Sequence, residues 1–121
     1  MNTELCETPA RELRRRIGSR ELSPRELLEN CRARVESVDP GLNAIPHTCW
    51  ERAETEALEA ERQVMMGAPL GPLHGLPIAI KDTQLTAGVR TTLGSPIYAN
   101  QTPTEDERMV AAVREAGAIV I

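Results

Sequence analysis

Residues 71–82 (GPLHGLPIAIKD) constrain the fold of this chain more than any other segment. The proline- and glycine-rich first half predicts a loop, and the apolar residues 78–80 predict a short buried strand. The strand ends in Lys81. A lysine that is buried loses hydration, its pKa falls, and its neutral amine becomes available as a base. The simpler alternative is that the chain returns to water here and the Lys81 stem covers apolar neighbours.

Further motifs surround this segment in a fixed order. They are 21–27 (ELSPREL), 39–44 (DPGLNA), 86–88 (TAG), Thr91-Thr92, Gly94-Ser95, Asp106 and 116–119 (AGAI). This ordered set, which runs from about Leu22 to the last residue, resembles the amidase signature family. The resemblance implies hydrolysis of amide bonds without a metal or organic cofactor.

The resemblance also implies a triad of a nucleophilic serine, a second serine held by a cis peptide bond, and a lysine that matches Lys81. The neutral lysine would take a proton through the second serine, while backbone N–H groups hold the oxyanion. The family places both serines in a Gly/Ser-rich segment downstream of the lysine. None of the serines here, Ser19, Ser23, Ser37 and Ser95, lies in a Gly-Ser-Ser-Gly run or a Gly-x-Ser-x-Gly turn. The chain therefore carries a base without a matching nucleophile.

The last residues, 118–121 (AIVI), follow Gly117 and predict the start of an interior strand. An apolar strand at a chain end leaves an edge without a partner. We therefore expect an N-terminal fragment of a longer enzyme, marginally folded or prone to aggregate on its own.

The predicted fold class is α/β and incomplete. Residues 1–66 are expected to form a helical N-terminal arm with flanking helices. Residues 67–121 are expected to begin a catalytic core that is a mixed sheet covered by helices. A strand at Ile78, a loop, a helix and a strand at Ala118 follow in an order that suits parallel neighbours.

Four helices are expected from caps and apolar periodicity. Their signals are an N-cap at Thr8 with an end at Gly18; a capping box at Ser23 and Glu26 with a stop at 39–41; small apolar residues at 53, 57, 60 and 64 within 50–66; and a capping box at Thr104 and Glu107 with Met109, Val110 and Val113 inward and an end at Gly117.

The segment 82–101 predicts a loop with local hydrogen bonds. Asp82 is expected to bond backbone groups, because a tight ion pair with Lys81 would favour the protonated amine and oppose a base role. The hydroxyls of Thr91, Thr92 and Ser95 are expected to bond neighbouring turns.

Composition narrows the class of protein. A formal net charge of −4 argues against a general nucleic-acid binder. The scattered Cys6, Cys31 and Cys49 suit free thiols in a reducing compartment, and no pair has the spacing of a metal site. No signal peptide is apparent, and no apolar run approaches the roughly 20 residues of a membrane span. We therefore expect a cytoplasmic protein with no membrane partner.

Three functions remain open. The first is hydrolysis of a small-molecule amide. The second is the role of the amidase-like subunit in a glutamine-dependent transamidation complex, which acts on misacylated transfer RNA and would share Lys81. The third is a catalytically inactive association module, since the helix that begins at Ser23 offers an apolar stripe through which the N-terminal helices could form a homo-oligomer. The pattern does not identify the amide.

Overall fold

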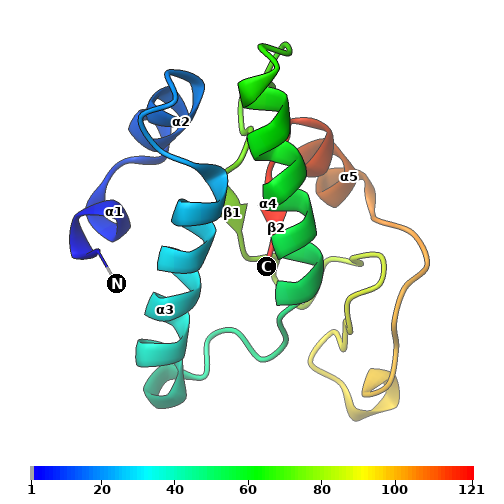
Figure 1. Ribbon diagram of the computed structural model, residues 1–121. Helices are drawn as coiled ribbons and strands as arrows, with labels where there is room; N and C mark the ends of the chain where they lie inside the picture. Colours follow the sequence, from blue (N-terminus) through cyan, green and yellow to red (C-terminus); the bar gives the residue numbers. More distant parts are fainter. Residues whose placement is uncertain (1) are drawn as a thin grey trace.

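The computed structural model describes residues 2–121 and shows helices packed around a two-stranded sheet. The long helices α3 and α4 lie side by side against the sheet, and the chain between β1 and α5 forms a long excursion beside them (Figure 1). The elements are α1 (Thr3–Glu7), α2 (Ala10–Gly18), α3 (Pro24–Leu42), α4 (Trp50–Met65), β1 (Pro77–Ile78), the 3-10 helix η1 (Pro96–Tyr98), α5 (Arg108–Glu115) and β2 (Ile119–Val120).

The two strands are parallel neighbours, as the order of elements predicts. Pro77 is opposite Ile119 and Ile78 is opposite Val120. The N–H of Ile119 donates to the carbonyl of Leu76 at 2.9 Å, which fixes this register. The α/β class, with only the first strands of a sheet, is thereby confirmed.

The predicted buried strand over 78–80 is wrong in extent and in burial. Pairing stops at Ile78, Ala79 is exposed, and Ile78 and Ile80 are half-buried. The reason is that β1 has one neighbour, β2, within residues 2–121, so nothing covers its other edge. An apolar run predicts the strand, whereas its burial depends on neighbours.

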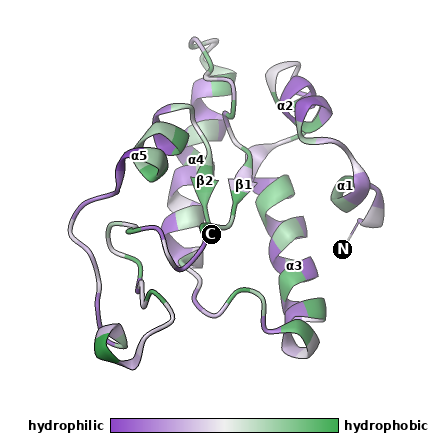
Figure 2. Ribbon diagram, turned by 180° about the vertical axis from the view of Figure 1, so that it is seen from behind, coloured by the Kyte–Doolittle hydropathy of each residue, from purple (hydrophilic) through white to green (hydrophobic). Residues whose placement is uncertain are grey.

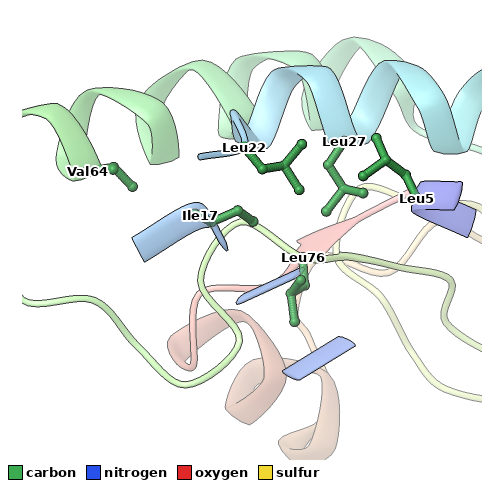
Figure 3. Packing of buried hydrophobic residues seen from close by; sticks show 6 residues of the cluster. All are labelled: Leu5, Ile17, Leu22, Leu27, Val64 and Leu76. Carbon is green, nitrogen blue, oxygen red and sulfur yellow. The ribbon is translucent and has the colours of Figure 1, made fainter. Parts of the chain in front are cut away.

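The core is aliphatic and forms two clusters. The first joins the N-terminal helices to the chain before β1 (Figure 3) and consists of Leu5, Ile17, Leu22, Leu27, Val64 and Leu76. The second joins α3 and α4 to β2 and consists of Leu28, Ala53, Ala57, Ala60, Ile119 and Ile121. Figure 2 shows the apolar strands between helices that carry both apolar and polar residues. The small residues predicted for one face of α4 are buried, and they let that helix approach β2 closely.

The division of the chain into an arm and a catalytic core at residue 66 stays a prediction.

The start of α3 follows its sequence signal. Ser23 is the N-cap, and its Oγ accepts the N–H of Arg25 at 3.1 Å and of Glu26 at 3.5 Å, while Pro24 occupies the first helical turn. The same hydroxyl donates to Oε1 of Glu61 on α4 at 2.5 Å. Ser23 therefore stabilises both the helix and its contact with α4.

We expect Ser23→Ala to lower the free energy of unfolding by about 1 kcal/mol, the usual effect of losing a serine N-cap. Ser37→Ala is the matched control, because Ser37 is exposed on the same helix. Urea unfolding monitored by circular dichroism measures both variants. Equal midpoints for the two would show that the cap does not stabilise the fold.

Two predicted helix boundaries in the N-terminal half are wrong. Thr8 does not cap α2; it ends the additional helix α1, where its hydroxyl donates to the carbonyl of Glu4 at 2.7 Å. The stop predicted at 39–41 is also too early, since α3 continues to Leu42. Proline inside the last turn removes only one N–H, and the left-handed Asn43 (φ 53°) then ends the helix.

The capping box predicted at Thr104 is wrong as well. Helix α5 begins at Arg108, and its N-cap residue Glu107 makes no side-chain capping bond. Val110 is fully buried, but Met109 is 44% exposed rather than inward. Gly117 does follow the helix with φ 94°, as predicted. Among residues 2–121, no helix combines the length and apolarity needed to cross a bilayer.

Candidate active site

Lys81 comes just after β1 and is the only lysine of the chain. Its side chain is exposed within the described residues, which agrees with the simpler of the two alternatives, a chain that returns to water at this point. The cause is again the uncovered edge of β1. Within residues 2–121 Lys81 makes no ion pair, although acidic residues are abundant. Its amine is therefore not held in place or neutralised by a neighbouring carboxylate.

Asp82, the next residue, bonds Thr92 rather than Lys81. Its Oδ1 accepts the backbone N–H of Thr92 at 2.7 Å, and its Oδ2 accepts the Thr92 hydroxyl. The hydroxyl first and the backbone N–H second hold the pKa of Asp82 below its ordinary value. These bonds stabilise the fold above the ordinary pKa and are lost as the pH falls through the lowered one. The expectation that Asp82 bonds backbone groups is confirmed.

A cavity of about 320 Å³ opens beside Lys81. It lies at the carboxyl ends of the parallel strands, the edge at which open α/β sheets bind ligands. Four segments contribute lining residues: the α3–α4 connection, the chain after β1, the following loop, and the end of β2. The lining includes Asn43, Ala44, Ile45, Pro46, His47, Ala79, Ile80, Lys81, Asp82, Gln84, Thr86, Val89, Arg90, Thr91, Val120 and Ile121.

The threonines of the cavity wall make local bonds, which the sequence predicts for Thr91 but not for Thr86. Thr86 is 3% exposed, and its hydroxyl donates to the carbonyl of Gln84 at 3.1 Å. Thr91 is 2% exposed and donates to the carbonyl of Val89 at 3.0 Å. Ser95 caps η1 by accepting the N–H of Ile97. These hydroxyls shape the loop and are engaged by backbone groups.

None of the four serines lines the cavity. Ser23 and Ser95 are N-caps, the hydroxyl of Ser19 donates to Glu21 at 2.7 Å, and Ser37 is exposed on α3. Within residues 2–121 the cavity is therefore lined by a lysine and by no serine. The same residues contain no group of three or more side chains placed to bind a metal ion.

His47 is a cavity residue that the sequence does not reveal. It lies in the irregular connection between α3 and α4, and its charge acts with the Thr92 bonds to lower the pKa of Asp82. No periodicity or motif marks a residue that reaches a site through a loop, so only the fold brings His47 to Lys81.

Comparison with known proteins places this site in a family context. The family description Amidase matches residues 26–121. The chain is 39% identical over 118 residues to a glutamyl-tRNA(Gln) amidotransferase subunit of Geobacter metallireducens, and 36% identical over 116 residues to the corresponding protein of Carboxydothermus hydrogenoformans. These alignments cover 98% and 96% of this chain but 24% of each relative. The chain thus spans about a quarter of the length of the curated relatives it matches.

Solved structures agree with the sequence comparisons. A bacterial aryl acylamidase of the amidase signature enzymes superposes with a TM-score of 0.86 at 27% identity, over 94% of this chain and 24% of that one. The peptide amidase of Stenotrophomonas maltophilia superposes with a TM-score of 0.83 at 29% identity, over 95% and 24%. Fatty acid amide hydrolase, at 22% identity and a TM-score of 0.90, shares the fold.

Proposed function

The chain belongs to the amidase signature family, and from this premise we propose that it supplies the base, Lys81, of an enzyme that cleaves the carbon–nitrogen bond of a small-molecule amide. The observation that carries the proposal is the position of Lys81, the only lysine, in a cavity at the carboxyl ends of parallel strands. The three cysteines are free, which supports a reducing compartment such as the cytoplasm.

The proposed mechanism is acyl transfer to serine. The neutral amine of Lys81 accepts a proton through a bridging serine from the nucleophilic serine, whose oxygen forms a bond to the amide carbonyl carbon. The carbon–nitrogen bond then breaks, and the leaving nitrogen takes up the proton. Water next cleaves the acyl ester to give the acid and regenerate the serine. Both serines have to come from outside the four of this chain, since none of those lines the cavity.

Two features support a base role for Lys81. Asp82 directs both carboxylate oxygens to Thr92, so the nearest acidic residue in sequence does not hold the amine in its charged form. The exposure of Lys81 toward the cavity also leaves room for a substrate and a serine next to it.

A second candidate is the release of ammonia from glutamine within a transamidation complex. The observation that favours it is the identity of 36–39% to proteins named as subunits of glutamyl-tRNA(Gln) amidotransferase. Turnover of glutamine but not of simple aliphatic or aryl amides, by an active protein that contains this chain, would select this candidate. The opposite preference would select a general amidase.

The isolated 121-residue chain is expected to hydrolyse amides and esters no faster than buffer. Lys81 alone has no nucleophile to activate. Release of amine or ammonia is measured for the chain and for Lys81→Ala. Saturable turnover that survives Lys81→Ala would contradict the role of Lys81, and turnover that this change abolishes would reveal a nucleophile within the chain.

A further inference from the structure

The cavity wall next to Lys81 is held by a two-stranded loop with little regular structure. Residues 85–91 run beside residues 101–107 in the opposite direction. Backbone N–H groups of Glu107, Gly88 and Thr91 donate to the carbonyls of Leu85, Pro103 and Gln101 at 2.9, 2.9 and 3.0 Å. Residues 86 and 89–91 of the inner segment line the cavity. The shape of the cavity therefore depends on what fixes this loop to the helices.

The Ala87 peptide groups are held from two sides. Asp106 Oδ1 accepts the N–H of Ala87 at 2.7 Å, and Arg52 Nη1 on α4 donates to the Ala87 carbonyl at 2.7 Å. Ala87 follows Thr86, a buried residue of the cavity wall. Charged side chains thus fix the backbone directly beside the cavity.

The two side chains that hold Ala87 are connected to each other by ion pairs. Glu56 Oε1 accepts from Arg52 Nε and from Arg114 Nη1, both at 2.9 Å. Arg114 Nε lies 2.9 Å from Asp106 Oδ2. Contacts therefore run from Ala87 through Arg52, Glu56, Arg114 and Asp106 back to Ala87. We call these four side chains the loop clamp.

The ion pair of Arg114 and Asp106 in the loop clamp is partly buried. The side chains of Arg114 and Asp106 are 14% and 15% exposed. Arg114 Nε and Nη2 are buried without an aligned hydrogen bond within residues 2–121, so the contact with Asp106 is ionic. Two cations and two anions balance one another here. Removing one anion leaves a guanidinium without its counter-charge, which is costly for a buried group.

We propose that the loop clamp positions the cavity wall beside Lys81, with Asp106 and Arg114 as positioning residues that act through Ala87 and Thr86. The effect of the loop clamp on catalysis rests on the function proposed above. Its structural consequence, a fixed Ala87 peptide, can be measured without activity.

The single lysine makes the test direct. The chain is labelled with 13C at the lysine Cε, which gives one resonance that reports Lys81 alone. Amide hydrogen exchange is followed at Ala87 and, as a reference in the core, at Ile119. The variants are Asp106→Ala, Asp106→Asn and the control Glu105→Ala, which removes the neighbouring exposed carboxylate.

Asp106→Ala is expected to speed hydrogen exchange at Ala87 by at least about tenfold. The substitution removes the charge-assisted hydrogen bond that protects the Ala87 N–H, so this part of the loop opens more often. Exchange at Ile119 stays within about twofold, and the Lys81 resonance shifts. Asp106→Asn, which keeps an oxygen acceptor for Ala87, restores part of the protection. Glu105→Ala changes neither readout. Unchanged exchange at Ala87 and an unmoved Lys81 resonance in Asp106→Ala would overturn the proposal.

If Asp106→Ala unfolds the whole chain, exchange at Ile119 will also become faster. The proposal is then tested with Asp106→Asn, Arg114→Gln and the double variant that carries both changes. Their combined effect on Ala87 exchange is expected to be smaller than the sum of the single effects, since each removes the same contact. Additive effects would overturn the loop clamp. In an active protein that contains this chain, Asp106→Ala should lower kcat by at least about tenfold, while Glu105→Ala stays within about twofold.

The two proposals fail in different ways. If Lys81→Ala retains activity, the function proposed for Lys81 is wrong, whereas the exchange and resonance results still decide on the loop clamp. If Asp106→Ala leaves Ala87 protected, the loop clamp is wrong and the base role of Lys81 is unaffected.

Discussion

Lys81→Ala is expected to lower kcat by at least about 10²–10⁴-fold in an active protein that contains this chain, the usual effect of removing a positioned general base. The fold should be unaffected, because Lys81 is exposed and makes no ion pair within residues 2–121. A suitable protein is a chimera in which residues 1–121 replace the matched segment of the bacterial aryl acylamidase, assayed on an aryl acylamide. Circular dichroism of each variant reports the fold.

Lys81→Arg should lower kcat nearly as much as Lys81→Ala, because a guanidinium cannot lose its proton at working pH. This variant keeps the positive charge and so separates a base from a cation that only binds substrate. Arg34→Ala, which removes an exposed cation on α3, is the control and should leave kcat within about twofold. An activity of Lys81→Ala within about threefold of the parent would remove Lys81 from the mechanism.

Local chemistry explains which parts of the fold the sequence predicts. Ser23 and Pro24 begin α3, the small residues of α4 face β2, and Gly117 turns the chain into β2 as expected. Each of these depends on residues adjacent in sequence or spaced along one helix. The expectation that Asp82 bonds backbone groups also holds, but the sequence does not identify its partner, because Thr92 lies ten residues further along the loop.

Long-range packing explains what the sequence does not predict. Whether Lys81 is buried or exposed depends on what covers β1, and the apolar run before it carries no such information. The capping pattern at Thr104 fails because carboxylates of the same segment are engaged elsewhere: Asp106 bonds Ala87, and Glu107 accepts the N–H of Leu85 at 3.0 Å. A motif cannot show that a distant loop competes for its side chains.

The residues that line and support the cavity are also brought together by long-range packing. The segments 86–88 and Asp106 are conspicuous in the sequence, but nothing in it connects them. The structure joins them through the bond from Ala87 to Asp106, and it brings His47 to the same cavity from the α3–α4 connection. The sequence therefore points to Lys81 as a candidate, and the structure places it in the cavity, whereas the groups that surround it could not be predicted.

Gly117→Ala is expected to have the largest effect on stability. Gly117 has φ 94°, and a Cβ there would lie 2.8 Å from Cα of His74. The strained backbone costs about 1–2 kcal/mol, and the clash with main chain costs about 1–3 kcal/mol. The turn matters for the site because the N–H of Gly75 donates to the Gly117 carbonyl at 2.9 Å, next to the pairing of β1 with β2. A melting temperature lower by on the order of 10 °C should result.

Three other glycines separate strain from clash. Gly94 has φ 67° with open space around it, so Gly94→Ala carries strain alone. A Cβ at Gly71 would lie 2.3 Å from the carbonyl oxygen of Ala116, so Gly71→Ala carries the clash alone, while Gly41 has open space and no positive φ. The expected loss of stability is largest for Gly117→Ala, intermediate for Gly71→Ala and Gly94→Ala, and near zero for Gly41→Ala. If Gly117→Ala and Gly94→Ala have the same melting temperature, the close approach of residues 74 and 117 does not determine the register of β1. The position of Lys81 must then be fixed by other contacts.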